Sequence, residues 1–455
     1  MPAVHYRTQM SSSDAIIWHI EDDPHLQSTV MAVWLLDSVP TDERMQANID
    51  RMIEAIPRLR ERVEPARQRP NWVAVDDLDV TRHYSVHAMP EGSGPRNVLD
   101  FAEGWANEPF DRARPLWRLG LLTGLEGGGG AAVIKVHHAI ADGLGMVLML
   151  AAFTDLERDP PPVEPTDFIA EEPEREAFGP VRRMWFKTRQ AATTVARRPL
   201  HSVVDATATA SSTIRLVFPH RTPHSKLMTE RSGRRHLDAR AIPLDDIKRA
   251  SKRSGASIND VFVSIFADAT DRYHAAHGVA CRRLRVHVPV NSRTERTAGH
   301  AGNDFVPARL SLVVPGGGAD QRLASVSEQL TRLRAEPALK HINPVSAFVQ
   351  RLGKPIAKWI VGGMMKGVDI LASNVQGPPF PLYLAGAKVD EFYAMGPPAG
   401  ASVNITMFSY DGVASFSITS DAAAIADRAG FLRCLDEAIA DATTPAPVTA
   451  EPVPA

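Results

Sequence analysis

Hydrophobic residues in the first third of the chain alternate between strand-like and helix-like spacing. Residues 29–36 (TVMAVWLL) are an unbroken apolar run rich in β-branched side chains, which predicts a buried strand. Apolar residues then recur at helical spacing after the cap candidates Thr41 and Asp42, and Pro57 ends this helix; the apolar positions are Met45, Ile49, Met52, Ile53 and Ile56. The same criteria predict a helix over 98–105 and strands over 72–75, 116–122 and 131–136.

The same mixture of patterns returns after residue 235. Helices are expected over 244–253, 258–277 and 423–440, and strands over 284–290, 305–314, 370–373, 389–394, 402–408 and 414–419. Since strands and helices alternate in both halves, the sequence predicts an α/β protein built from two lobes.

The segment between the two halves has a different composition. It begins with six prolines among acidic residues and continues as a basic run, within which apolar residues share one helical face: Val181, Met184, Trp185, Ala192 and Val195. Two interpretations of this basic amphipathic helix stay open: it packs on the body with its arginines in water, or it docks on an anionic lipid surface. The chain therefore divides into a first lobe (1–156), a crossover (157–234), a second lobe (235–442) and a disordered tail (443–455).

Composition narrows the class of protein. The 51 basic and 53 acidic residues of this 455-residue chain give a net charge of −2, which argues against a protein held on nucleic acid by its overall charge. Two cysteines cannot build a disulfide framework or a four-thiolate zinc site, and they indicate a reducing compartment. With no signal-like N-terminus and no apolar run of about 20 residues, we expect a cytoplasmic protein, peripheral to a membrane or lipid inclusion if the basic helix binds lipid.

Few sites for chemistry stand out. Four glycines, 127–130, lie between two strands rather than before a helix, so a hairpin turn is favoured over a phosphate loop. His83 and His87 lack a carboxylate pattern that would complete a zinc site, so they are interpreted as incidental surface histidines and no metal site is predicted. By contrast, His137 and His138 end an apolar strand directly before a turn into a helix, where a neutral imidazole can act as a general base. A pair of buried, satisfied histidines is the competing interpretation.

Further residues extend this motif into a family resemblance. His137, His138, Asp142 and Gly143 form a His-His-x-x-x-Asp-Gly sequence that matches the signature of the CoA-dependent acyltransferase superfamily. The chain resembles, in particular, the bacterial wax ester synthase/diacylglycerol acyltransferases. The matching segments lie in order along the chain: Ser13-Asp14-Ala15 with Glu21 (a looser match), Pro115-Leu116-Trp117, Asn259-Asp260-Val261, 302–307 (GNDFVP), 373–378 (SNVQGP), and Asn404-Ile405-Thr406 with Ser409-Tyr410.

The resemblance implies a fold and a reaction. It implies two chloramphenicol-acetyltransferase-like lobes joined by a long crossover, with the active site in a tunnel between them. His138 would be the general base that takes the proton of an acceptor hydroxyl as its oxygen attacks the thioester of acyl-CoA. His137 would support the loop that carries its neighbour. The implied reaction forms no covalent acyl-enzyme and uses no cofactor, since acyl-CoA and a lipid alcohol are its substrates.

Other residues receive supporting roles. Asp142 is expected to be structural, and Gly143 to allow the turn. Arg293 is the candidate ion-pair partner of Asp142 by analogy with condensation domains, or else a plain surface arginine. Asn259 is favoured as a helix N-cap that acts indirectly on the tunnel, and Asn374 as a residue of the lobe interface.

Three functions are compatible with these residues. The first is an acyl-CoA-dependent O-acyltransferase that converts diacylglycerol to triacylglycerol, a long-chain alcohol to a wax ester, or both. The second is a condensation-like acyltransferase that takes its acyl group from a carrier-protein thioester. The third is a non-catalytic lipid-binding paralogue, against which the intact His-His-x-x-x-Asp-Gly motif argues.

Overall fold

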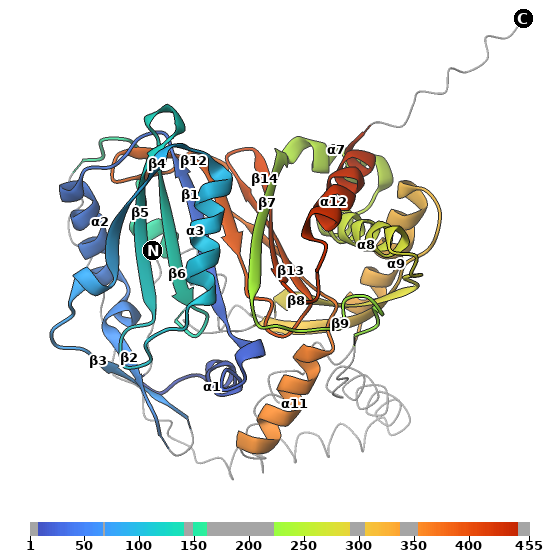
Figure 1. The fold of residues 1–455 in the computed structure, drawn as a ribbon, viewed down its shortest axis with the longest axis horizontal. Helices are drawn as coiled ribbons and strands as arrows, with labels where there is room; N and C mark the ends of the chain where they lie inside the picture. Colours follow the sequence, from blue (N-terminus) through green and yellow to red (C-terminus); the bar gives the residue numbers. More distant parts are fainter. Residues whose placement is uncertain are drawn as a thin grey trace, which may run out of the picture.

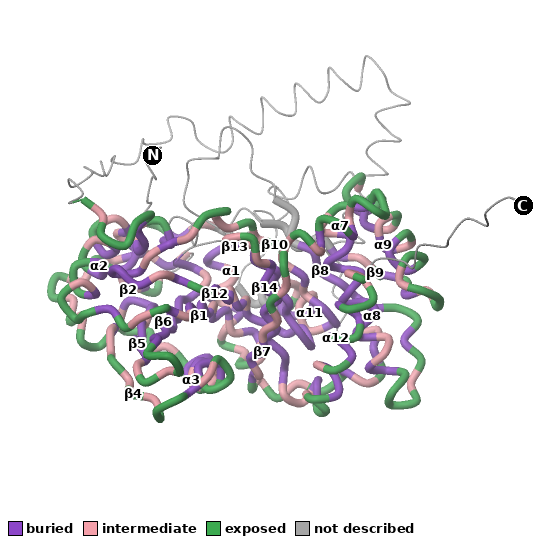
Figure 2. Tube along the Cα trace, turned by 90° about the horizontal axis from the view of Figure 1, so that it is seen from above, coloured by how far each residue is buried: buried purple, intermediate pink, exposed green. Residues whose placement is uncertain are grey.

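Two six-stranded sheets form the framework of the molecule (Figure 1). The computed structural model describes residues 8–66, 69–140, 149–161, 223–291, 305–336 and 354–444. Within these ranges, the first sheet has the strand order β11-β12-β1-β6-β5-β4 and the second the order β7-β14-β13-β10-β8-β9. The predicted two-lobed α/β class is confirmed. Buried residues concentrate along the strands, and exposed residues on the outer helices and turns (Figure 2).

The first lobe follows the predicted pattern closely. Strand β1 spans Thr29–Leu36, exactly the apolar run of the sequence, and helix α2 spans Asp42–Ala55 behind the N-cap Thr41. The glycines lie in a hairpin between the antiparallel strands β5 and β6, not in a phosphate loop. The other elements are α1 (Ser12–Ile20), η1 (Pro24–Leu26), η2 (Pro57–Arg60), β2 (Glu61–Glu64), β3 (Asn71–Ala74), η3 (Val80–Arg82), β4 (Tyr84–Ser93), α3 (Pro95–Asn107), β5 (Trp117–Leu125), η4 (Glu126–Gly128) and β6 (Gly130–His137).

Two strands from the second half of the sequence belong to the first sheet. Strand β12 (Ala387–Met395) pairs antiparallel with β1, and β11 (Tyr383–Leu384) pairs with β12. The lobe boundary expected from the sequence, which placed all of 235–442 in the second lobe, therefore needs correction. The physical reason is that β12 completes the hydrogen bonding of β1, and that its side chains enter the apolar clusters on both faces of the first sheet.

The second lobe packs helices on one face of its sheet. Phe262 and Phe266 of α8 contact Phe416 of β14 in the middle of this core. The C-terminal helix begins at Arg428, five residues later than predicted, because the Asp427 carboxylate accepts the N–H of Gly430 as its cap. The elements are β7 (Arg235–Pro243), α7 (Leu244–Ser254), α8 (Ile258–Ala276), β8 (Arg283–Asn291), β9 (Phe305–Val313), α9 (Ala319–Arg334), α11 (Lys354–Lys366), β10 (Ile370–Gln376), β13 (Val403–Tyr410), β14 (Val413–Asp421) and α12 (Arg428–Thr443).

A buried ionic network joins the lobes where α3 lies against β7 (Figure 1). The buried Asp238 carboxylate accepts Arg96 from α3 at 2.7 Å and Arg428 from α12 at 2.8 and 2.9 Å. Glu103 of α3 also accepts Arg428, at 3.2 Å, and the N–H of Leu237 at 3.0 Å. Helices α3 and α12 and strand β7 are thus linked through the carboxylates of Asp238 and Glu103. These ion pairs and hydrogen bonds fix α3 against the second sheet.

Removing the central carboxylate of this network should loosen the molecule. We expect Asp238→Ala to lower the free energy of unfolding by about 2 kcal/mol, since it leaves two guanidinium groups without their buried acceptor. Asp100→Ala is the matched control, because Asp100 also binds Arg96 but its side chain is 58% exposed, and such exposed pairs contribute about 0–1 kcal/mol. Thermal and urea unfolding of both variants measures the difference. Equal effects of the two substitutions would contradict the proposed importance of the buried acceptor.

Several predicted features lie outside the described residues. They include the amphipathic face between residues 181 and 195, most of the 157–234 crossover, and the tail from residue 445. In the part of the chain that the structure describes, every helix is too short or too polar to cross a lipid bilayer.

Candidate active site

The histidine pair lies where β6 ends. His137 is the last residue of the strand, in register with Thr29 of β1, and its N–H donates to the carbonyl of Leu116 at 3.0 Å. The N–H of His138 then donates to the carbonyl of Ser28 at 2.9 Å. Because backbone hydrogen bonds to the residues directly before β5 and β1 hold both histidines, the pair lies at the rigid C-terminal end of an inner strand of the first sheet, a strand end as the sequence predicted.

Both ring nitrogens of His137 are engaged. Its Nδ1 accepts the N–H of Ala139 at 3.0 Å, so that nitrogen carries no proton. The proton therefore resides on Nε2, which donates to the Glu21 carboxylate at 2.7 Å. The residue is 2% exposed, and its ring makes T-shaped contacts with Trp18 and Phe110 at centroid distances of 5.5 and 6.1 Å. His137 is thus a buried, satisfied histidine with a fixed tautomer.

Glu21 connects three elements to this imidazole. It caps the end of α1, and besides His137 its carboxylate accepts the N–H of Ser28 and a guanidinium N–H of Arg112, the latter at 3.2 Å. Burial raises the pKa of Glu21, but the facing imidazole of His137, the Ser28 N–H and the Arg112 guanidinium outweigh it and hold the pKa below its usual value. The carboxylate therefore stays ionised at neutral pH.

His138 is the next residue along the chain, and its N–H donates to the Ser28 carbonyl. It is half-buried and follows the rigid strand end directly, at the start of the turn that the sequence predicted. His137 cannot accept a substrate proton without losing one of its two hydrogen bonds, so His138 remains the predicted candidate for proton transfer. The two interpretations left open by the sequence thus apply to one residue each: His137 is the satisfied histidine, and His138 is the candidate base.

Of the remaining predicted residues, only Asn259 and Asn374 lie in the described part of the chain. Asp142, Gly143 and Arg293 lie outside the described residues, so their roles stay predictions. Asn374 is exposed on β10, and no hydrogen bond within the described ranges joins it to the histidines. Its neighbour Val375 packs against the core of the first lobe instead.

The capping role expected of Asn259 is wrong. The N-cap of α8 is Ser257, whose hydroxyl accepts the N–H of Asp260 at 3.2 Å, while the Asp260 carboxylate accepts the N–H of Ser257 at 3.1 Å. An N-cap must lie just outside the helix, three residues before the N–H that it accepts, and Asn259 is already the second helical residue. Asp260 also accepts Arg334 at 3.1 Å and so ties α8 to the end of α9.

The sequence patterns did not predict that Glu21 and Arg112 lie at the histidine pair. Glu21 was part of a loose motif match, and nothing in the spacing of the chain predicts that it meets His137, 116 residues away. The signal that could have found Glu21 is an acidic residue that ends a short helix directly before the first buried strand.

His83 also differs from its expectation. Far from being a surface residue, it is 5% exposed, stacks on Trp117 and binds the carbonyl of Trp117 through Nδ1 at 2.9 Å. Among the described residues, no three metal-ligating side chains converge.

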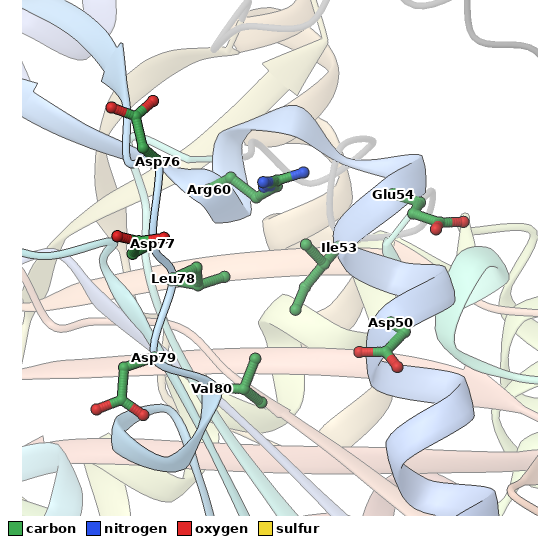
Figure 3. Close-up of a pocket in the computed structure, with 9 residues that line it drawn as sticks. All are labelled: Asp50, Ile53, Glu54, Arg60, Asp76, Asp77, Leu78, Asp79 and Val80. Carbon is green, nitrogen blue, oxygen red and sulfur yellow. The ribbon is translucent and has the colours of Figure 1, made fainter.

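A separate open hollow of about 540 Å³ lies on the first lobe between α2 and residues 76–80 (Figure 3). Five carboxylates and one guanidinium line it together with three apolar side chains: Asp50, Glu54, Asp76, Asp77, Asp79, Arg60, Ile53, Leu78 and Val80. It contains neither histidine of the pair, so it is distinct from the candidate active site.

Comparison with known proteins agrees with this geometry. Residues 10–262 match the wax ester synthase/diacylglycerol acyltransferase catalytic domain, and residues 301–442 match the C-terminal domain of the same family. The chain belongs to the wax ester synthase/diacylglycerol acyltransferase family. A Mycobacterium tuberculosis protein named as a diacylglycerol O-acyltransferase is 31% identical over 96% of this chain and 93% of its own length. Another such protein from M. tuberculosis is 27% identical over 95% of each chain.

Solved structures confirm the fold. The wax ester synthase/diacylglycerol acyltransferase from Marinobacter aquaeolei VT8 superposes with a TM-score of 0.63 at 19% identity, covering 96% of this chain and 98% of that one. The first condensation domain of the CDA synthetase gives a TM-score of 0.58 at 17% identity, covering 96% and 97%. As a member of this family the chain is an acyltransferase, and the family implies an acyl donor and a lipid alcohol as its substrates.

Proposed function

We propose that this acyltransferase moves the acyl group of acyl-CoA to the hydroxyl of a lipid alcohol, with diacylglycerol as the main acceptor and long-chain alcohols as a second class. Membership of the family supports the reaction, and the names of the mycobacterial relatives support the acceptor. The observation that carries the mechanism is the full engagement of His137 by Glu21 and Ala139, which leaves His138 as the base.

The proposed step is a direct transfer. The hydroxyl oxygen of the acceptor attacks the thioester carbonyl while His138 accepts the hydroxyl proton. The tetrahedral intermediate then collapses, the carbon–sulfur bond breaks, and the proton passes from His138 to the sulfur of CoA. One ester forms for each CoA thiol released, so the step requires no covalent acyl-enzyme and no cofactor. A positioned base of this kind contributes about 10²–10⁴-fold to the rate.

Glu21 and His137 act as positioning residues in this mechanism. Their hydrogen bond fixes the end of β6, and the N–H of Ala139 fixes the first residues of the following turn on the same imidazole. The backbone on both sides of His138 is therefore held by one buried carboxylate, which keeps the base oriented without contact between Glu21 and substrate.

The proposed acceptor also suggests where the enzyme works. Diacylglycerol resides in lipid, so we place the enzyme in the cytoplasm, in peripheral contact with a membrane surface or a lipid inclusion. Peripheral contact suits a chain whose described helices are too short or too polar to cross a bilayer.

One assay tests the proposed reaction. Purified protein is incubated with labelled palmitoyl-CoA and, in separate reactions, diacylglycerol in phosphatidylcholine vesicles, hexadecanol or a short alcohol. We expect CoA release that depends on the acceptor, with triacylglycerol as the main product and wax ester as the second. Two negative outcomes overturn the proposal: lipid binding without CoA release identifies a non-catalytic paralogue, and transfer from an acyl-carrier-protein thioester alone identifies a condensation-like enzyme.

A further inference from the structure

A buried lysine lies beside the candidate active site. Lys135 is two residues before His137 in β6, so both side chains project from the same face of the first sheet. Its side chain is 0% exposed, and it forms no ion pair with a carboxylate of the described residues. A buried ammonium is costly unless it is well hydrogen-bonded, so an apolar residue would suit the stability of this position better.

The ammonium group binds the end of α3. Its Nζ donates to the carbonyl of Glu108 at 2.6 Å and lies 4.4 Å from the ring centroid of Phe110. Glu108 is the C-cap of α3, where the carbonyls and the helix dipole favour a cation. The buried Arg235 of β7 binds the same helix end, donating to the carbonyl of Ala106 at 2.6 Å. Cations from both lobes therefore meet at the C-terminus of α3.

The segment that follows α3 forms a wall of the site. The ring of Phe110 makes a T-shaped contact with the His137 ring, whereas Arg112 donates to Glu21 at 3.2 Å and stacks on Trp18 at 4.3 Å. Residues 108–112 thus contact the imidazole and its carboxylate from one side. Lys135 holds the start of this segment, through one carbonyl and one aromatic ring.

We propose that Lys135 is a positioning residue for acyl transfer: its ammonium holds residues 108–112 against the Glu21–His137 pair and so keeps the neighbouring His138 oriented. This inference rests on the proposed function. Full activity then requires two groups in the right protonation state: a neutral base and a positively charged Lys135.

Burial and the charges around Lys135 place its titration near pH 8. Burial, assisted by the nearby charges of Arg118 on β5 and Arg235 on β7 and opposed by Glu108, lowers the pKa of Lys135 to about 8. Activity should therefore fall as the pH rises through about 8, because the neutral amine donates a weaker hydrogen bond to the Glu108 carbonyl and loses its cation–π contact with the Phe110 ring. Stability should change in the opposite direction. The pKa in the folded chain is below its usual value of 10.5, so this group makes unfolding less favourable as the pH rises from about 8 toward 10.5.

The test compares pH profiles of kcat for the wild type, Lys135→Met and Lys135→Arg. We expect the wild-type profile to fall on its alkaline side near pH 8. Lys135→Met should reduce kcat at pH 7 by about tenfold through misplacement of the site, lose the alkaline fall, and unfold at the same temperature as the wild type or higher. Lys135→Arg stays charged throughout this range, so it should retain most of the activity at pH 7 and no longer lose it near pH 8.

Arg118→Met is the matched control. Arg118 binds the carboxylate of the same Glu108 at 2.7 Å and stacks on Trp105, whereas Lys135 binds the backbone carbonyl of Glu108 and the ring of Phe110. We expect its kcat at pH 7 to stay within about twofold of the wild type, because its ion pair with Glu108 is partly exposed to solvent, and its alkaline fall to move to higher pH, because a positive charge near Lys135 is lost. A Lys135→Met protein that is folded and keeps the wild-type kcat and alkaline fall overturns the positioning role. An inactive wild type would overturn the proposed function instead, so the two failures are distinguishable.

Discussion

His138→Ala should abolish acyl transfer, with a fall in kcat of about 10²–10⁴-fold, while the protein stays folded. The substitution removes the proposed base and leaves the backbone hydrogen bond from residue 138 to Ser28, and the whole Glu21–His137 pair, in place. Release of CoA from palmitoyl-CoA with diacylglycerol measures activity, and circular dichroism with thermal unfolding measures the fold.

His87→Ala is the control for this prediction. His87 is a half-buried histidine on β4 of the same lobe. Its ring packs against Phe101 and Trp105 of α3, away from the end of β6. Its loss should leave kcat within a few-fold of the wild type. A well-folded His138→Ala protein with more than a tenth of the wild-type kcat would assign the proton transfer to another group.

Glu21→Gln should reduce both activity and stability although it barely changes the size of the side chain. The carboxylate accepts three donors, from His137, Ser28 and Arg112, and an amide offers one oxygen where these donors need two. One of them must then face an N–H group of the glutamine. We expect a loss of about 1–3 kcal/mol in the free energy of unfolding, and a fall in kcat of about 10- to 100-fold through misplacement of the turn that carries His138.

Asp22→Asn provides the control, since the neighbouring carboxylate is 62% exposed and lies 3.8 Å from the same Arg112. It should change neither kcat nor stability appreciably. The pH dependence gives a second check. Because the folded-state pKa of Glu21 is lowered, its stabilisation is complete above the unfolded value of about 4.5 and is lost as the pH falls through the folded value. The stability difference between wild type and Glu21→Gln should therefore shrink in acid; a difference that does not change with pH would exclude the carboxylate charge as its cause.

The site depends on segments that are distant in the sequence. α1 supplies Glu21, the segment after α3 supplies Arg112, and the second lobe supplies Arg235, which also donates to the side chain of Gln27 at 2.6 Å. The lobe interface at Asp238 fixes α3, whose end carries the wall of the site. Stability of the interface and geometry of the base are therefore linked through one helix.

The spacing of apolar residues along the chain predicted many of the helices and strands. The strands β1, β5 and β6 and the helices α2, α3, α7 and α8 arise where expected, because each buries one apolar face whose spacing is visible in the sequence. The patterns did not predict the helices α1, α9 and α11 or the strands β4 and β7. Strand β4 presents mostly half-buried and exposed residues, so it lacks the apolar alternation that identifies a strand.

The sequence by itself determined the two-lobed α/β class, the position of the histidine pair at a strand end and, through its ordered motifs, the acyltransferase family. Only the tertiary structure decided that β12 completes the first sheet, that Glu21 and Ala139 occupy both nitrogens of His137, and that Ser257 rather than Asn259 caps α8. The reason is physical. Periodicity reports which faces of an element are buried, whereas strand partners and carboxylate contacts depend on where distant segments meet, and spacing along the chain does not encode those meetings.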